Sequence, residues 1–180
     1  MATTTPNLGL VKPDYEDLAD VAVLNDNSDT IDAAVKAVQD SVSQGAITAI
    51  VPQDYTFSVT TYTQLPLGNY TSYGDAFTLS NNAITCNKAG YVFACSSLAF
   101  IDVNDTNVCN SRISRGNTVI AQGIQRSSGS YGQPNISGIV FPVSSGDVIT
   151  LSACNSSNGS GKITAGSNRS FITLVMLSTR

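Results

Sequence analysis

The sequence predicts an all-β protein, an antiparallel jelly-roll sandwich, preceded by an extended N-terminal segment and a short coiled-coil helix. From residue 47 onward, short runs rich in β-branched and aromatic residues are separated by clusters of Gly, Asn, Ser and Pro. This is the pattern of antiparallel strands joined by turns. Ser, Thr and Asn make up nearly a third of the chain, which is common on β-sheet surfaces and rare in helical enzymes.

Charge divides the chain into two parts. Residues 1–45 carry eight acidic and two basic side chains, whereas the remainder carries five acidic and seven basic ones. Two physically different parts are the simplest interpretation. The expected organisation is an attachment segment, a coiled-coil helix, a linker and a jelly-roll head, at 1–27, 28–45, 46–54 and 55–180.

The N-terminal segment is expected to be extended, because Pro6 and Pro13 disfavour helix at the residues before them. Asn27 or Ser28 is then expected to cap a helix that ends near Gly45.

An apolar stripe runs along this helix. It is made of two seven-residue series offset by four: Leu24, Ile31 and Val38, and Ser28, Val35 and Val42. A helix of roughly 15 residues is marginal alone, so the stripe needs a partner. The stripe could pack on its own domain, but a short parallel coiled coil between identical chains is the interpretation we favour.

Short runs with period-two character, separated by turn signals, suggest a β-sandwich or jelly roll for the head. These runs are 55–62, 75–79, 83–85, 91–101, 108–114, 118–125, 137–143, 147–153, 162–164 and 170–177.

Two of these strands are apolar on both faces. Phe171 and Val175 share one face of 170–177, with Leu174 on the other, and Tyr91 and Phe93 share one face of 91–101. An antiparallel sandwich normally exposes one face to water, so an apolar outer face should be covered. A neighbouring copy of the chain would cover it. The predicted trimer interface therefore comprises Leu24, Ile31, Val35, Val38, Val42, Tyr91, Phe93 and Phe171.

Composition excludes several functions. The chain has no His, so Ser-His-Asp and Cys-His catalysis and His-ligated zinc are impossible. A pI near 4.5 argues against a nucleic-acid partner. No apolar run is long enough to insert into a membrane, and no secretion signal opens the chain. The four cysteines show no C-x-x-C spacing and are expected to be reduced.

The N-terminal segment resembles the attachment segments of bacteriophage tail-fibre and appendage proteins. The similarity rests on TPNLGLVKP at 5–13 and DLADVAVLNDNSDTID at 17–32, although Ser28 stands where those segments often have an aromatic residue. The resemblance implies that another virion structural protein binds this segment. The anchor residues it implies are Leu8, Leu10, Lys12 and Pro13.

A second resemblance covers residues 55–178. GDAFTL at 74–79, ITCNKAGYVF at 84–93, VSSGDVITL at 143–151 and SFITLVML at 170–177 are similar, in that order, to the jelly-roll heads of the complement first-component and tumour necrosis factor superfamily. The resemblance implies a ten-stranded jelly roll that trimerises about an axis lined by apolar strands.

Hard oxygen donors cluster at 102–107, where Asp102, Asn104 and Asp105 could bind Ca²⁺. The segment lacks the bidentate Glu and the glycine turn of an EF-hand loop. A structural loop is therefore the interpretation we favour, and no cofactor is expected.

Arginines and tyrosine in a Gly-rich region suit contacts with glycans or acidic groups. A second donor-rich loop spans 155–161, and loops on a rigid sandwich often carry recognition. Solvated surface and plain connector are the alternatives. The candidate receptor-binding residues are Arg112, Arg115, Arg126, Tyr131, Asn155 and Asn158.

The sequence thus predicts a non-enzymatic, homotrimeric bacteriophage fibre or appendage protein, assembled in the host bacterial cytoplasm and located in the virion. The head is expected to bind a glycan or protein of the host-cell surface. Purely structural decoration of capsid or tail is the alternative. A glycan depolymerase is a weaker one, because it needs two suitably spaced carboxyls and the head offers few.

Overall fold

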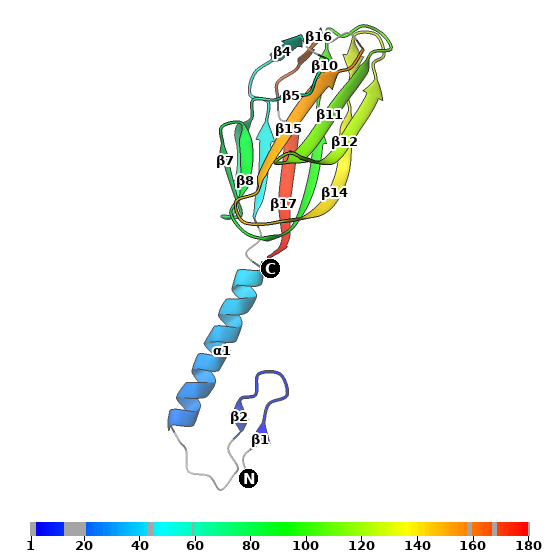
Figure 1. Cartoon of the computed structure of the whole chain (residues 1–180). Coiled ribbons are helices and arrows are strands. Elements are labelled where there is room, and N and C mark those ends of the chain that lie inside the picture. The colour runs from blue at the N-terminus through cyan, green and yellow to red at the C-terminus, as the bar shows by residue number, and fades with distance from the viewer. Residues whose placement is uncertain are drawn as a thin grey trace. The chain divides into compact units, whose positions relative to one another are not determined.

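The computed structural model describes residues 3–12, 21–42, 45–58, 60–157, 160–166 and 169–179. The chain forms two compact units, Met1–Ser43 and Gln44–Arg180, which we call the N-terminal unit and the head (Figure 1).

The N-terminal unit contains a two-stranded antiparallel hairpin and one helix. β1 (Thr3–Thr4) pairs with β2 (Val11–Lys12), and the backbone N–H of Thr5 donates to the carbonyl of Leu10 at 2.9 Å. Gly9 adopts a φ of +66° in the turn, which glycine tolerates without steric cost. The helix, α1, spans Val21–Val42.

The helix begins earlier than predicted, and Asn27 and Ser28 lie inside it. The Ser28 hydroxyl donates to the carbonyl of Leu24 at 2.9 Å, an i to i−4 bond that helices accommodate. Asn27 instead joins the hairpin to the helix: its Oδ1 accepts from the N–H of Val11 at 3.0 Å, and its Nδ2 donates to the Val11 carbonyl at 2.9 Å.

Two antiparallel sheets pack face to face in the head (Figure 1). The first, which we call the β9–β17 sheet, has the order β14 (Asn135–Val143), β9 (Gly90–Ser97), β17 (Phe171–Thr179), β3 (Ala46–Ile50), β6 (Gly68–Tyr73). The second, the β11–β15 sheet, has the order β12 (Thr118–Arg126), β11 (Val108–Arg115), β15 (Val148–Asn155), β8 (Ala83–Cys86), β7 (Phe77–Ser80), with β5 (Thr63–Gln64) also pairing β15.

A smaller sheet forms one end of the sandwich. Its order is β13 (Tyr131–Gly132), β10 (Phe100–Ile101), β16 (Ser160–Ile163), β4 (Tyr55–Ser58).

The hydrophobic core lies between the two large sheets. Ile47, Leu174, Ile113 and Leu151, from four different strands, are each at most 2% exposed. Burying an aliphatic side chain of this size contributes roughly 1.5–3 kcal/mol. The predicted antiparallel jelly-roll sandwich is confirmed.

Several strand assignments differ from the sequence prediction: β3, β5, β6 and β13 were not predicted, and the predicted strand 91–101 is divided into β9 and β10. Residues 46–54 were expected to be a linker, but β3 pairs with β17 on one side and β6 on the other. Its alternating residues Ile47 and Ala49 face the core, a pattern that is weak in sequence because the intervening residues are Ala and Thr. β6 was missed as well, because its six residues are Gly, Asn, Ser, Thr and two Tyr.

Candidate functional site

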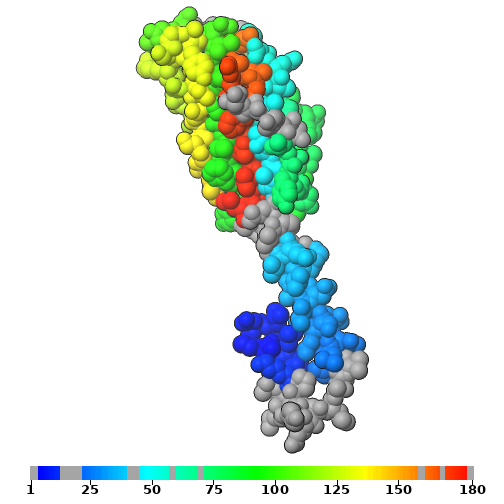
Figure 2. Space-filling view, turned by 180° about the vertical axis from the view of Figure 1, so that it is seen from behind, coloured from blue at the N-terminus to red at the C-terminus, as the bar shows by residue number. Residues whose placement is uncertain are grey.

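Part of the outer face of the β9–β17 sheet is apolar, as the sequence predicts. Figure 2 shows β14 in yellow, β9 in green, β17 in red and β3 in cyan side by side on this face. The register places Phe93 opposite both Val140 and Val175. We call this surface the apolar face; it comprises Tyr91, Phe93, Val140, Val175 and Leu177, and Phe171 lies beyond it at the other end of the sheet.

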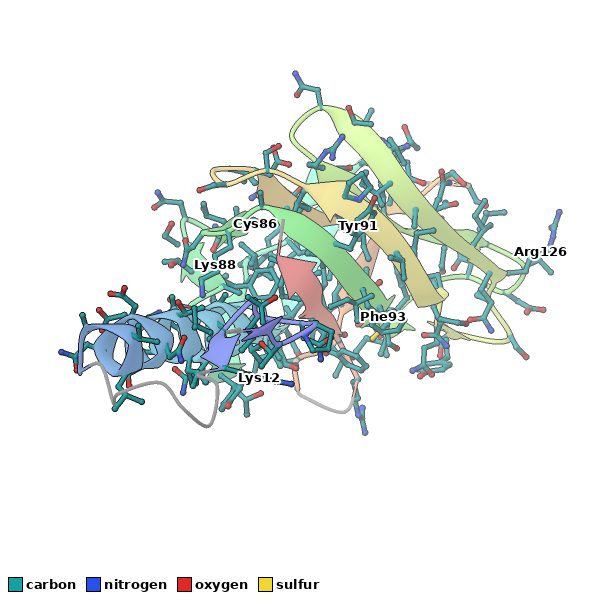
Figure 3. The ribbon with its side chains drawn as sticks, turned by 90° about the horizontal axis from the view of Figure 1, so that it is seen from below. Lys12, Cys86, Lys88, Tyr91, Phe93 and Arg126 are labelled. Carbon is teal, nitrogen blue, oxygen red and sulfur yellow. The ribbon has the colours of Figure 1, made fainter. Side chains whose placement is uncertain are left out.

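Side chains of the apolar face are accessible in the single chain. Val140 is 52% exposed, Leu177 43% and Tyr91 40%, whereas Phe93 is half-buried, as is Phe171 beyond this face. Figure 3 labels Tyr91 and Phe93 on β9. Neighbouring large apolar side chains at this level of exposure mark an interaction surface.

The stripe on α1 is also accessible. Leu24, Ile31, Val35 and Val38 are 44–61% exposed, and the side chain of Val42 lies outside the described residues. The hairpin adds a wall to this stripe. Leu8 and Asn7 of the turn, together with Ile31, Val35 and Val38, line a groove of about 420 Å³.

Of the predicted anchor residues, Leu8 is 44% exposed, Lys12 is exposed and Leu10 is half-buried. Pro13 lies outside the described residues. The exposed Leu8 therefore belongs to the groove as well as to the predicted attachment segment.

Two of the predicted receptor-binding arginines make internal contacts. The Arg112 guanidinium lies over the Tyr62 ring, 3.4 Å from its centroid. Arg115 donates to the Pro142 carbonyl and lies 3.8 Å from the Asp147 carboxylate. Neither guanidinium is free for a receptor in the way that the sequence prediction requires.

The structure also separates the predicted receptor-binding residues. Arg126 pairs with Val108 at one end of the β11–β12 ladder, and Arg115 lies at the other end. Figure 3 shows Arg126 at the edge of the head, directed away from it.

Asn155 is fully buried at the end of β15, so its predicted exposed role is wrong. Its Oδ1 accepts from the N–H of Ser157 at 3.1 Å, which stabilises the turn that follows. Asn158 lies outside the described residues. Tyr131 is 44% exposed and donates to Gln133 Oε1 at 2.8 Å.

The 102–107 segment is held by hydrogen bonds within the protein. Asp105 Oδ1 accepts from the N–H groups of Thr106 and Gly129, at 3.0 Å each. Asp102 and Thr106 adopt positive φ values. Within the described ranges, no three Asp, Glu, His or Cys side chains come close enough to hold a metal ion. The geometry fits the structural-loop interpretation of Asp102, Asn104 and Asp105.

The other head carboxylates are engaged in local contacts. Asp54 pairs with Lys162 at 2.7 Å, Asp75 pairs with Lys88 at 2.6 Å, and Asp147 accepts from the N–H of Ser144 at 2.8 Å. The Ala165 amide and the Lys162 ammonium lower the pKa of Asp54, and Lys88 lowers that of Asp75. A general acid needs the opposite shift, so these two carboxyls are poor candidates for that role.

All four cysteines are free thiols. Burial raises the pKa of Cys86 to about 12 and that of Cys109 to about 11. Cys154 is buried too and donates to the Thr60 carbonyl at 3.2 Å. Cys95 is the most accessible thiol.

A pocket that the sequence prediction missed lies beside the apolar face. It has a volume of about 370 Å³, and its lining includes Ser97, Gln133, Asn135, Ser137 and Phe171. Three separate strands and a loop contribute to it, and no sequence motif joins them.

Among the described residues, no helix is both long and apolar enough to cross a lipid bilayer.

No protein-family model and no curated protein matches this sequence. Solved structures do match it. The crystal structure of murine APRIL at pH 5.0 is 15% identical, with a TM-score of 0.60, and the match covers 74% of this chain and 99% of that one. The structure of Eiger TNF from S. frugiperda is 14% identical, with a TM-score of 0.55, and the match covers 75% and 93% of the two chains. The chain therefore has a TNF-like jelly-roll fold.

Proposed function

We propose that this chain is a non-enzymatic, homotrimeric fibre or appendage protein of a bacteriophage virion, and that its head adheres to the host-cell surface. The observation that carries the trimer is the apolar face of the head. Val140, Leu177 and Tyr91 would remain 40–52% exposed in a lone chain, and identical neighbours packed around an axis would cover them.

The stripe on α1 supports the same assembly. Leu24, Ile31, Val35 and Val38 repeat at heptad spacing and are exposed in the single chain. A parallel coiled coil would bury them. Two and a half heptads of mostly β-branched residues are a weak association element, so the head should supply most of the affinity.

Attachment to the virion through residues 1–27 rests on the phage-like sequence pattern. In this proposal the protein is assembled in the bacterial cytoplasm and incorporated into virions. Mass spectrometry of purified virions, with imaging by an antibody against the head, tests this placement. The protein's absence from virions would overturn it.

The trimer is tested by light scattering on the full chain and on residues 44–180. Both should have the mass of three chains. Val175→Asp places a charge on the apolar face and should yield monomers, whereas Gln122→Asp, on exposed β12, should not. A monomeric wild-type head would contradict the proposed use of the apolar face.

Adhesion and decoration are separated by a binding assay. Labelled wild-type head should adsorb to host cells, and variants of the exposed Arg126 and Tyr131 test the contacts that the sequence suggests. Removing a desolvated, charge-assisted contact costs affinity, whereas exposed substitutions typically change stability by about 0.5 kcal/mol or less. A head that does not adsorb at all would favour the decoration role.

A further inference from the structure

The pocket lined by Ser97, Gln133, Asn135, Ser137 and Phe171 lies at one end of the β9–β17 sheet. The chain enters this sheet at the opposite end. Ala46, where β3 begins, pairs with Val175, whereas Ile50 at the other end of β3 pairs with Phe171. Ser97 pairs with both Phe171 and Asn135. A head tethered through residue 45 therefore has this pocket at the far end of its sheet.

One wall of the pocket is held in place by hydrogen bonds. Gln133 Nε2 donates to Ser97 Oγ at 2.9 Å, and Gln133 Oε1 accepts from the Tyr131 hydroxyl at 2.8 Å. The backbone N–H of Gln133 donates to Gln125 Oε1 at 2.7 Å. These bonds leave one Nε2 proton of Gln133 and the hydroxyl proton of Ser97 available to a ligand. Groups fixed in this way lose little entropy on binding.

The other wall offers polar groups that are not used within the protein. Asn135 and Ser137 of β14 are exposed, and their side chains make no hydrogen bond to another described residue. The hydroxyl of Ser96 is not one of these groups, because Ser96 pairs with the core residues Ile136 and Ile172 and its side chain therefore lies on the opposite face of the sheet from that of Ser97.

Among the described residues, the lining contains no charged side chain. An anionic or cationic ligand would find no opposite charge there to offset the loss of its hydration. Phe171 contributes a half-buried aromatic ring. A flat apolar surface surrounded by neutral amides and hydroxyls matches a pyranose, which has an apolar C–H face and a rim of hydroxyl groups.

We propose that this pocket is a binding site for a neutral saccharide. The proposal deepens the adhesion role and rests on it for its biological meaning, because it names the chemistry that the head would recognise. It also moves recognition away from Arg112 and Asn155, and it assigns Phe171 to a ligand rather than to the trimer axis.

The test is saturation-transfer NMR on the full chain with methyl glycosides of glucose, galactose, mannose and N-acetylglucosamine. Glucuronic acid and N-acetylneuraminic acid are the charged probes. At least one neutral glycoside should receive saturation, and the charged probes should receive much less. Ser137→Tyr, which fills the pocket, should weaken binding by about tenfold or more, a change of about 1.4 kcal/mol.

Matched variants separate the pocket from general damage. Asn135→Asp replaces the amide donor of the pocket by a carboxylate and should weaken binding of the neutral glycoside. Ser72→Tyr makes the same change as Ser137→Tyr on exposed β6, and Asn117→Asp is the control for Asn135→Asp. Both controls should bind like wild type, and light scattering should give one mass for all variants. No binding of any neutral glycoside, equal binding of the charged probes, or unchanged binding by Ser137→Tyr would each overturn the proposal.

A cell-adsorption assay distinguishes failure of the pocket from failure of the adhesion role. Adsorption without glycoside binding would overturn the pocket and leave adhesion standing. Glycoside binding that Ser137→Tyr abolishes, in a protein that never adsorbs to cells, would support the pocket and contradict the adhesion role.

Discussion

The guanidinium of Arg112 lies over the ring of Tyr62, 3.4 Å from the ring centroid. The pair covers the outer side of the β11–β15 sheet, where Asn110 Nδ2 also approaches Cys154 Sγ at 3.8 Å. Burial raises the pKa of the Tyr62 hydroxyl, in keeping with an enclosed ring. Arg112 thus stabilises the sheet surface rather than presenting a free cation.

This arrangement predicts energetic coupling between the two side chains. In a double-mutant cycle, Arg112→Ala and Tyr62→Ala should each lower the free energy of unfolding, with a coupling of roughly 0.5–2 kcal/mol, the range of cation–π contacts. Urea unfolding measures it. Tyr62→Phe is the control: the Tyr62 hydroxyl is buried and makes no hydrogen bond to another described residue, so its removal should cost little. Additive effects of the two alanine variants would show that the contact carries no energy.

The α1 stripe gives a prediction about association. Val38 is 61% exposed in the single chain, so Val38→Asp would change a lone helix by about 0.5 kcal/mol or less. In a coiled coil the same change buries a charge, and melting of the helical circular-dichroism signal should move to clearly lower temperature. Ala33→Asp, on the opposite side of the heptad, is the control and should have little effect. Equal melting of the two variants would argue that no neighbour covers the stripe.

The thiols should react in a defined order. Thiolate is the reactive form, and burial raises the pKa of Cys86 to about 12 and that of Cys109 to about 11. In the folded protein at mildly alkaline pH, iodoacetamide should therefore modify Cys95 first and leave Cys86 and Cys109 unmodified. Intact-mass and peptide analysis follow the order. Unfolding without reductant should expose all four thiols; fewer than four adducts would reveal a disulfide.

The Asp54–Lys162 pair predicts a pH dependence of stability. The Ala165 amide and Lys162 hold the pKa of Asp54 below its usual 3.8. A carboxyl with a lower pKa in the folded state stabilises the fold above its unfolded pKa, and this contribution disappears as the pH falls through the folded pKa. Asp54→Asn should therefore lower Tm at neutral pH, and its difference from wild type should vanish in strong acid.

Lys162→Ala provides an independent check, because it removes the cation and keeps the carboxyl. It should also lower Tm at neutral pH, by less than Asp54→Asn, since the bond from Ala165 to Asp54 at 2.9 Å remains. A Tm difference that stays constant from neutral to acidic pH would exclude ionisation of Asp54 as the cause.

The fold was predictable because most strands carry a strong period-two signal. Runs such as 170–177 are dense in β-branched and aromatic residues, and β17 is where they predict it. β3 was not predictable, because the buried face of Ala46–Ile50 carries only one large apolar side chain, Ile47, and Ile50 lies on the other face. β3 lies between β17 and β6 in the sheet. Because β17 is far along the chain, the local sequence pattern does not reveal this pairing.

The candidate site was less predictable than the fold. Residue type alone does not reveal that the Arg112 guanidinium lies over the Tyr62 ring or that Asn155 is buried. Both facts depend on which segments pack next to β11 and β15. The pocket was missed for a similar reason. Its residues are ordinary Ser, Asn and Gln, brought together by the pairing of β9 with β14, where the register shifts between Ile136 and Ile139.

The position of β17 between β9 and β3 has a consequence for biosynthesis. The β9–β17 sheet joins the first strand of the head to its last, so no ribosome-bound chain lacking residues 171–179 can complete it. Helix α1 needs only local contacts and can form as soon as it leaves the ribosome, whereas sheets with such distant pairings form slowly. Because the stripe on α1 is a weak association element, the apolar face of each head is uncovered from the time its sheet is complete until two further copies bind, and this is the interval in which it is open to aggregation.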